Sequence, residues 1–219
     1  MVSHERLLAL PEVENLRRLS QSLAVLDAVM SPDWENWYYS FNSKWADGEM
    51  VASMRNGSGD GYFILFNPAG AIIKGFDHES AMSPYAGDEV KVWPGALDEV
   101  PEEFGSFLSE PAFTIEDVTF CIWRRYADPS WRTGTINYPG GDEDAEGSGW
   151  MLSILSGDPA EYQEFAEGYY ERPVDLDAVR HVYRHEPLTE GVVRRLNAEW
   201  SLEELVADLE EIGYPGGIT

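Results

Sequence analysis

The clearest pattern in the chain is a strict alternation of apolar and polar residues that begins at Trp37. Tyr38 falls on the polar face, and the aromatic face carries Trp37, Tyr39, Phe41 and Trp45. A period of two residues is typical of a β-strand with one buried face. Glycine-containing turn signals follow at regular spacing, at 46–49, 56–61 and 67–70. We therefore expect residues 37–80 to form a meander of four antiparallel strands.

Helical and strand patterns flank this meander. Leucines recur at three- and four-residue steps over 11–30, which predicts an amphipathic helix, and alternation predicts a strand over 117–126. Further strands are expected at 89–93 and 150–155, and further helices at 100–109, 158–171, 175–185 and 202–212, with one more helix before the last. Strands and helices do not alternate as a parallel sheet requires. The pattern predicts an α+β fold with an antiparallel sheet of about six strands, an N-terminal helix and a C-terminal cluster of helices.

We expect residues 1–219 to form a single domain. Within it, residues 1–157 contain the sheet, and residues 158–219 form a helical part packed on it. The chain is 43% hydrophobic and 13% aromatic, which is enough to build a sizeable core.

The chain is strongly acidic, with 40 Asp and Glu against 15 Lys and Arg and a formal net charge of −25. Its field repels nucleic-acid backbones and anionic membranes, so neither is an expected partner. Three interpretations of the acidity are open. It can simply keep the surface hydrated, as charged faces usually do. It can complement a basic protein partner, or it can bind cations.

Cysteine content and N-terminal composition favour a cytoplasmic protein. Cys121 is the only cysteine, so an intramolecular disulfide and a multi-cysteine zinc site are both excluded. The N-terminal residues include acidic side chains and Pro11 where a signal peptide requires an apolar core, and no apolar run reaches the length of a membrane span.

The densest group of reactive side chains is Asp77, His78, Glu79 and Ser80, at the end of the meander. Asp77 or Glu79 could orient His78 as a general base, with Ser80 as a nucleophile or as a hydroxyl that binds a ligand. The alternative is a turn in which Asp77 and Ser80 bond nearby backbone amides and His78 is exposed. Arg55 is a candidate partner for Asp60 or for a ligand carboxylate.

His181 and His185 are a second candidate group, four residues apart on a predicted helix. This spacing suits two imidazole ligands of one metal. A helical wheel places both rings away from the apolar stripe, beside Arg180 and Arg184, which favours a solvated face instead. No metal or other cofactor is expected.

The run from Met54 to Ser80, MRNGSGDGYFILFNPAGAIIKGFDHES, resembles sequences of uncharacterised bacterial proteins. The resemblance implies a bacterial origin, and it implies no activity and assigns no residue a role.

Two functional interpretations follow. The first is a non-enzymatic, acidic interaction protein that neutralises a basic protein, as bacterial immunity proteins neutralise toxins, with Tyr38 as an interface anchor. The second is a small-molecule-binding protein or hydrolase-like enzyme with its site at the Asp77, His78 and Glu79 loop and Arg55. A pocket that gathers those residues would favour the second.

Overall fold

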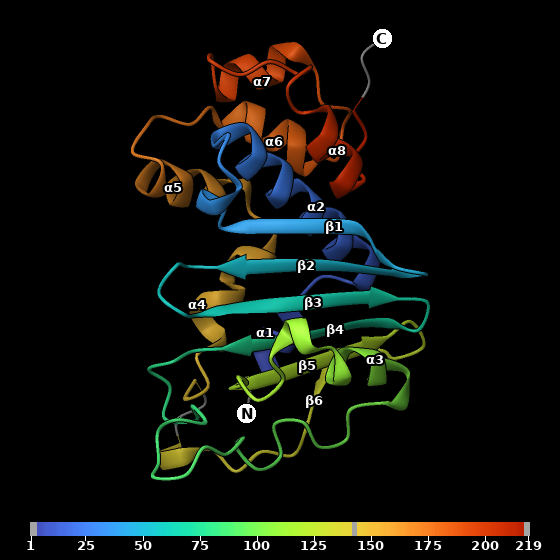
Figure 1. Cartoon of the computed structure of the whole chain (residues 1–219), viewed down its shortest axis with the longest axis vertical. Coiled ribbons are helices and arrows are strands. Elements are labelled where there is room, and N and C mark those ends of the chain that lie inside the picture. Colours follow the sequence, from blue (N-terminus) through green and yellow to red (C-terminus); the bar gives the residue numbers. More distant parts are fainter. Residues whose placement is uncertain (1–3, 142–143, 217–219) are drawn as a thin grey trace. The chain divides into compact units, whose positions relative to one another are not determined.

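The computed structural model describes residues 4–141 and 144–216 and has an α+β fold (Figure 1). Its antiparallel sheet has six strands in the order β1-β2-β3-β4-β5-β6. The strands are β1 (Tyr39–Ala46), β2 (Glu49–Arg55), β3 (Gly61–Asn67), β4 (Gly70–Phe76), β5 (Phe120–Arg125) and β6 (Arg132–Thr133). The predicted fold class and the predicted meander are confirmed.

The helices are short apart from the predicted N-terminal one. They are α1 (His4–Ala9), α2 (Val13–Met30), α3 (Gly105–Ser109), α4 (Ser148–Leu152), α5 (Pro159–Tyr169), α6 (Leu176–Tyr183), α7 (Glu190–Leu196) and α8 (Val206–Ile212). Polar caps begin three of the C-terminal helices: Asp158, Asp175 and Thr189 accept a hydrogen bond from a backbone N–H in the first turn of α5, α6 and α7. The C-terminal cluster of helices is therefore confirmed.

The chain divides into two compact units. Unit 1 comprises the residues up to Val13 together with Ser53–Ser153, and unit 2 comprises Glu14–Ala52 together with the residues from Ile154 onward.

Unit 1 is built on strands β3, β4 and β5. Ile64 pairs with Ile73 and Ile73 with Ile122 across the ladder, and all three side chains are fully buried. Gly75 of β4 pairs with Phe120 of β5, whose ring lies over the glycine. This close approach requires a residue without a side chain at 75.

Unit 2 combines α2, β1 and the C-terminal helices. Helix α5 packs on α6, α6 packs on α7, and α8 packs along β1. The buried carboxylate of Asp27 in α2 accepts hydrogen bonds from the backbone N–H groups of Tyr38 (2.8 Å) and Tyr39 (2.7 Å) and from the Tyr162 hydroxyl (2.7 Å). One side chain thus fixes the start of β1 and helix α5 against α2.

Two predicted strands are wrong. Residues 89–93 form no strand, and Val90 is 67% exposed, so that segment has no apolar face to bury. Residues 150–155 continue α4 and a following 3-10 turn, because Met151 and Leu155 bury one helical face at a four-residue spacing. A short apolar run fits both periods equally well, so the sequence alone cannot separate them.

Among the helices of residues 4–141 and 144–216, none has the length and apolar character that a bilayer crossing requires.

Candidate functional site

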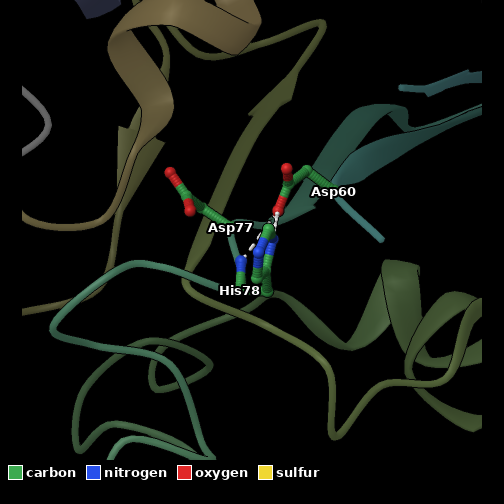
Figure 2. A group of neighbouring side chains, drawn as sticks. All are labelled: Asp60, Asp77 and His78. Carbon is green, nitrogen blue, oxygen red and sulfur yellow. Dashed lines mark hydrogen bonds and ion pairs between the residues drawn. The ribbon is translucent and has the colours of Figure 1, made fainter. Parts of the chain in front are cut away.

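Asp60, Asp77 and His78 come together in unit 1 at one end of β3 and β4. Asp60 directly precedes β3, and Asp77 and His78 directly follow β4, so the antiparallel pairing of Gly61 with Phe76 brings them to the same edge (Figure 2). One potential metal-ligand atom from each of the three residues lies within 4.8 Å of the others. The structure thus brings two of the predicted loop candidates, Asp77 and His78, together with Asp60, which precedes the neighbouring strand β3.

Asp60 holds His78 through two contacts with one carboxylate oxygen. The backbone N–H of His78 donates to Asp60 Oδ1 at 2.8 Å, and the ring Nδ1 lies 2.6 Å from the same atom. Asn56 donates to Asp60 Oδ2 at 2.6 Å. Burial by itself raises the pKa of Asp60, but these hydrogen bonds outweigh it and the pKa lies below its usual value. The hydrogen bond to Asp60 raises the pKa of His78.

We expect an NMR titration to show a pKa of His78 above the ordinary value of about 6.5, and a lower pKa in Asp60→Asn. The folded-state pKa of Asp60 is depressed, so its contribution to stability is lost as the pH falls below about 4. The folded-state pKa of His78 is raised, so its contribution is present below about 6.5 and lost as the pH rises through that pKa. The pair therefore stabilises the fold most between about pH 4 and 6.5. His185, which makes none of these contacts, is the internal control, and an unchanged His78 pKa in Asp60→Asn would contradict the pairing.

The other loop side chains act within a turn. The N–H of Glu79 donates to Asp77 Oδ1 at 3.0 Å, and the Trp150 indole donates to Asp77 Oδ2 at 3.1 Å. The Ser80 hydroxyl is buried, donates to the Ala145 carbonyl at 2.5 Å and accepts from the N–H of Met82. The bonds from the N–H groups of Glu79 and Met82 satisfy local backbone donors, and those with Trp150 and Ala145 join the turn to a segment distant in sequence. Ser80 is therefore not positioned as the nucleophile of a His78 base, which favours the turn interpretation.

A divalent cation is the cofactor that this group could hold. Two carboxylate oxygens and one imidazole nitrogen suit metals such as zinc or manganese. Nδ1 of His78 would first have to exchange its hydrogen bond to Asp60 for a bond to the metal. The geometry therefore favours a charge-assisted hydrogen bond between these residues.

Arg55 lines an adjoining pocket of about 320 Å³, together with Lys74, Asp117 and Asp60, which is shared with the group above. The residues of the 77–80 loop do not line it. Lys74 was not among the residues singled out from the sequence, although a lysine inside the apolar strand β4 is itself a signal. Asp117 was likewise given no role, and Asp60 was expected only as a partner of Arg55.

A larger groove of about 890 Å³ lies elsewhere on unit 1. Its apolar lining comes from Leu7, Pro101, Trp123 and Ile136, and its charged lining from Glu99, Glu102, Glu103, Arg125 and Arg132. Both arginines are engaged by Asp128, at 3.1 Å and 3.8 Å. The hydrogen bond from Arg125 holds the pKa of Asp128 below its usual range.

The remaining candidates lie in unit 2. Tyr38 is half-buried, with its ring 4.7 Å from Phe165 and 5.4 Å from Tyr169 between centroids. Both ring nitrogens of His181 have partners, with Nδ1 2.9 Å from Glu186 and Nε2 3.0 Å from a backbone carbonyl.

The ring of His185 lies elsewhere, against Tyr214, with Nε2 3.3 Å from Gln21. Burial, followed by the charges of Arg18 and Arg17, lowers the pKa of His185. Both histidine rings are half-buried and have different partners, so the structure does not bring them together.

Cys121 is fully buried in β5, and burial raises the pKa of its thiol to about 12. The thiolate that nucleophilic chemistry requires is therefore disfavoured at neutral pH.

The chain matches no protein-family model, no curated protein and no solved structure.

Proposed function

We propose that the protein is a non-enzymatic binding protein whose acidic surface engages a basic protein partner, in the manner of an immunity-type neutraliser. The observation that carries the proposal is the charge balance. Because the 40 carboxylates exceed the 15 Lys and Arg by 25, at least that many carboxylates have no Lys or Arg of their own in the chain. A field of this strength steers a basic partner into contact and raises the rate of association.

The groove of unit 1 is where we place this contact. The segment from residue 88 to 103 exposes six carboxylates, those of Asp88, Glu89, Asp98, Glu99, Glu102 and Glu103. The last three also line the groove, whose apolar lining includes Trp123 and Ile136. An arginine or lysine side chain lays its aliphatic stem on apolar surface and pairs its charged end with carboxylates. The groove offers both kinds of surface to a basic segment of the partner.

The site chemistry supports binding over catalysis. The pocket that contains Arg55 is not lined by the Asp77, His78 and Glu79 loop, so the gathering expected of an enzyme site at that loop is not formed. The Ser80 hydroxyl is engaged in two hydrogen bonds, and Cys121 is buried in the core. We therefore assign the proposed binding function to the acidic surface.

Affinity capture from the native cell tests the proposal, with the protein as bait at low and then at raised salt. We expect a basic protein to be retained and then released by salt, because salt screens exposed charge pairs. The purified partner should bind roughly tenfold more weakly to the triple variant Glu99→Gln, Glu102→Gln, Glu103→Gln, since exposed ion pairs contribute about 0.2–1 kcal/mol each.

The matched control carries Glu35→Gln, Glu164→Gln and Glu203→Gln, three exposed residues outside the groove that give the same change in net charge. It should bind nearly as the original protein does. Equal weakening in both triple variants would refute the groove as the contact, and the absence of any retained basic protein would refute the proposed function.

A further inference from the structure

The pocket beside Arg55 has a charge balance unlike that of the chain. Two cations, Arg55 and Lys74, and two carboxylates, Asp60 and Asp117, line it. In a chain with a net charge of −25, this lining is formally neutral. Its volume of about 320 Å³ lies at the small end of the range for ligand sites.

Lys74 is a buried cation with an unused donor. Its side chain is 2% exposed and lies on β4, paired across the ladder with Phe63. The ammonium group donates to the backbone carbonyls of Phe113 and of Thr114, the latter at 2.6 Å. An ammonium group has three N–H donors, so one remains for a group inside the pocket. Burial lowers the pKa of Lys74 to about 8, and the charges of Asp117 and Glu116 oppose that shift, so the amine is still largely protonated at neutral pH.

The two carboxylates differ in what they can offer a ligand. Asp60 is already engaged by His78 and Asn56 on its two oxygens. Asp117 accepts a hydrogen bond from the Tyr85 hydroxyl on Oδ1. Its Oδ2 accepts no hydrogen bond from the described residues, so Asp117 is the acceptor best placed for a cationic group of a ligand.

Aromatic rings form the apolar part of the lining. The rings of Phe63 and Phe113 lie 5.0 Å apart between centroids, and Phe76 completes the wall. The Phe63 ring centroid is 5.8 Å from the Lys74 ammonium group. A ligand that fits this lining needs an apolar body as well as polar groups.

We propose that this pocket binds a small zwitterion, an α-amino acid with an apolar or aromatic side chain. Its carboxylate would lie between Lys74 and Arg55, its ammonium group on Asp117, and its side chain against the phenylalanine rings. A purely anionic ligand would meet the two aspartates, and a purely cationic one would meet Lys74 and Arg55. Only a ligand carrying both charges matches the whole lining. This site is independent of the acidic groove.

Calorimetric titration with three related compounds tests the proposal: L-phenylalanine, 3-phenylpropionate, which lacks the amine, and phenethylamine, which lacks the carboxylate. We expect L-phenylalanine to bind at least tenfold more tightly than either analogue, because 3-phenylpropionate leaves the half-buried Asp117 without a ligand partner and phenethylamine leaves the buried Lys74 without one. L-leucine should also bind, since the rings contact apolar groups without requiring an aromatic partner. Equal affinity for all three phenyl compounds, or no binding of L-phenylalanine and L-leucine at millimolar concentration, would overturn the proposal.

Single substitutions distinguish binding in this pocket from non-specific binding elsewhere on the protein. Asp117→Asn keeps an acceptor for Tyr85 and should weaken L-phenylalanine binding at least tenfold while binding of 3-phenylpropionate is unchanged or stronger. The control Asp88→Asn removes one exposed carboxylate outside the pocket and should leave binding unchanged. Lys74→Met should abolish binding of the zwitterion. Should that variant fail to fold, because two carbonyls lose their donor, the Asp117→Asn result decides alone. Unchanged L-phenylalanine binding in Asp117→Asn would refute the site.

Discussion

Asp27→Ala is expected to lower the free energy of unfolding by roughly 3–6 kcal/mol, because it leaves two buried donors and one half-buried donor without an acceptor, at about 1–3 kcal/mol each. The donors are the backbone N–H groups of Tyr38 and Tyr39 and the hydroxyl of Tyr162. Domains are commonly stable by only about 5–15 kcal/mol. Urea denaturation followed by tryptophan fluorescence should therefore show a large drop in the midpoint. A loss below about 1 kcal/mol would contradict the role given to this carboxylate.

Asp27→Asn is the control, because it keeps an oxygen acceptor and removes the ionisable group. Burial raises the pKa of Asp27 from 3.8 to about 7, so the native state holds a proton that the unfolded chain releases above about pH 4. The stability contributed by Asp27 is therefore present below about pH 4 and is lost as the pH rises to about 7, by roughly 4 kcal/mol at most. The asparagine variant should lack this dependence between pH 4 and 7. If the free energy of unfolding depended on pH in the same way in the original protein and in Asp27→Asn, the raised pKa of Asp27 would be contradicted.

Gly75→Ala is expected to destabilise the protein by roughly 3 kcal/mol, at the upper end of the usual cost of overpacking a core. A Cβ at position 75 would lie 2.0 Å from the tip of the Phe120 ring, and Phe120 is fully buried. The ring would have to leave its place over β4, which also disturbs the pairing of β4 with β5. Thermal and urea unfolding measure the loss.

Gly105→Ala serves as the matched control in the same unit, since its backbone is helical and nothing lies within 4 Å of the added carbon. It should be neutral or slightly stabilising. Adding Phe120→Leu to Gly75→Ala should restore part of the lost stability, because the smaller side chain leaves room for the methyl group. If Gly75→Ala proved as harmless as Gly105→Ala, the close packing of Phe120 on Gly75 would be refuted.

The local patterns determined most of the fold. The alternation from Trp37 to Trp45 specified β1, the turn signals specified the strands that follow, and leucine spacing specified α2. Asp158 and Asp175 begin helices where their capping chemistry predicts. Each of these signals lies within a few neighbouring residues, so the sequence carries them directly. The net charge of −25 is likewise a property of the sequence, and the proposed function depends on it.

Tertiary structure decided the secondary structure of residues 150–155 and the surroundings of every candidate site residue. That run became a helix because the buried face of Met151 and Leu155, and not its intrinsic preference, selected the period. His78 and Asp60 are 18 residues apart in sequence, and only strand pairing brings them into contact. Lys74 meets its carbonyl partners 39 and 40 residues along the chain. Contacts between segments that are distant in sequence set the pKa values and form the pockets. The reactive residues could therefore be identified from the sequence, but which of them are in contact could not.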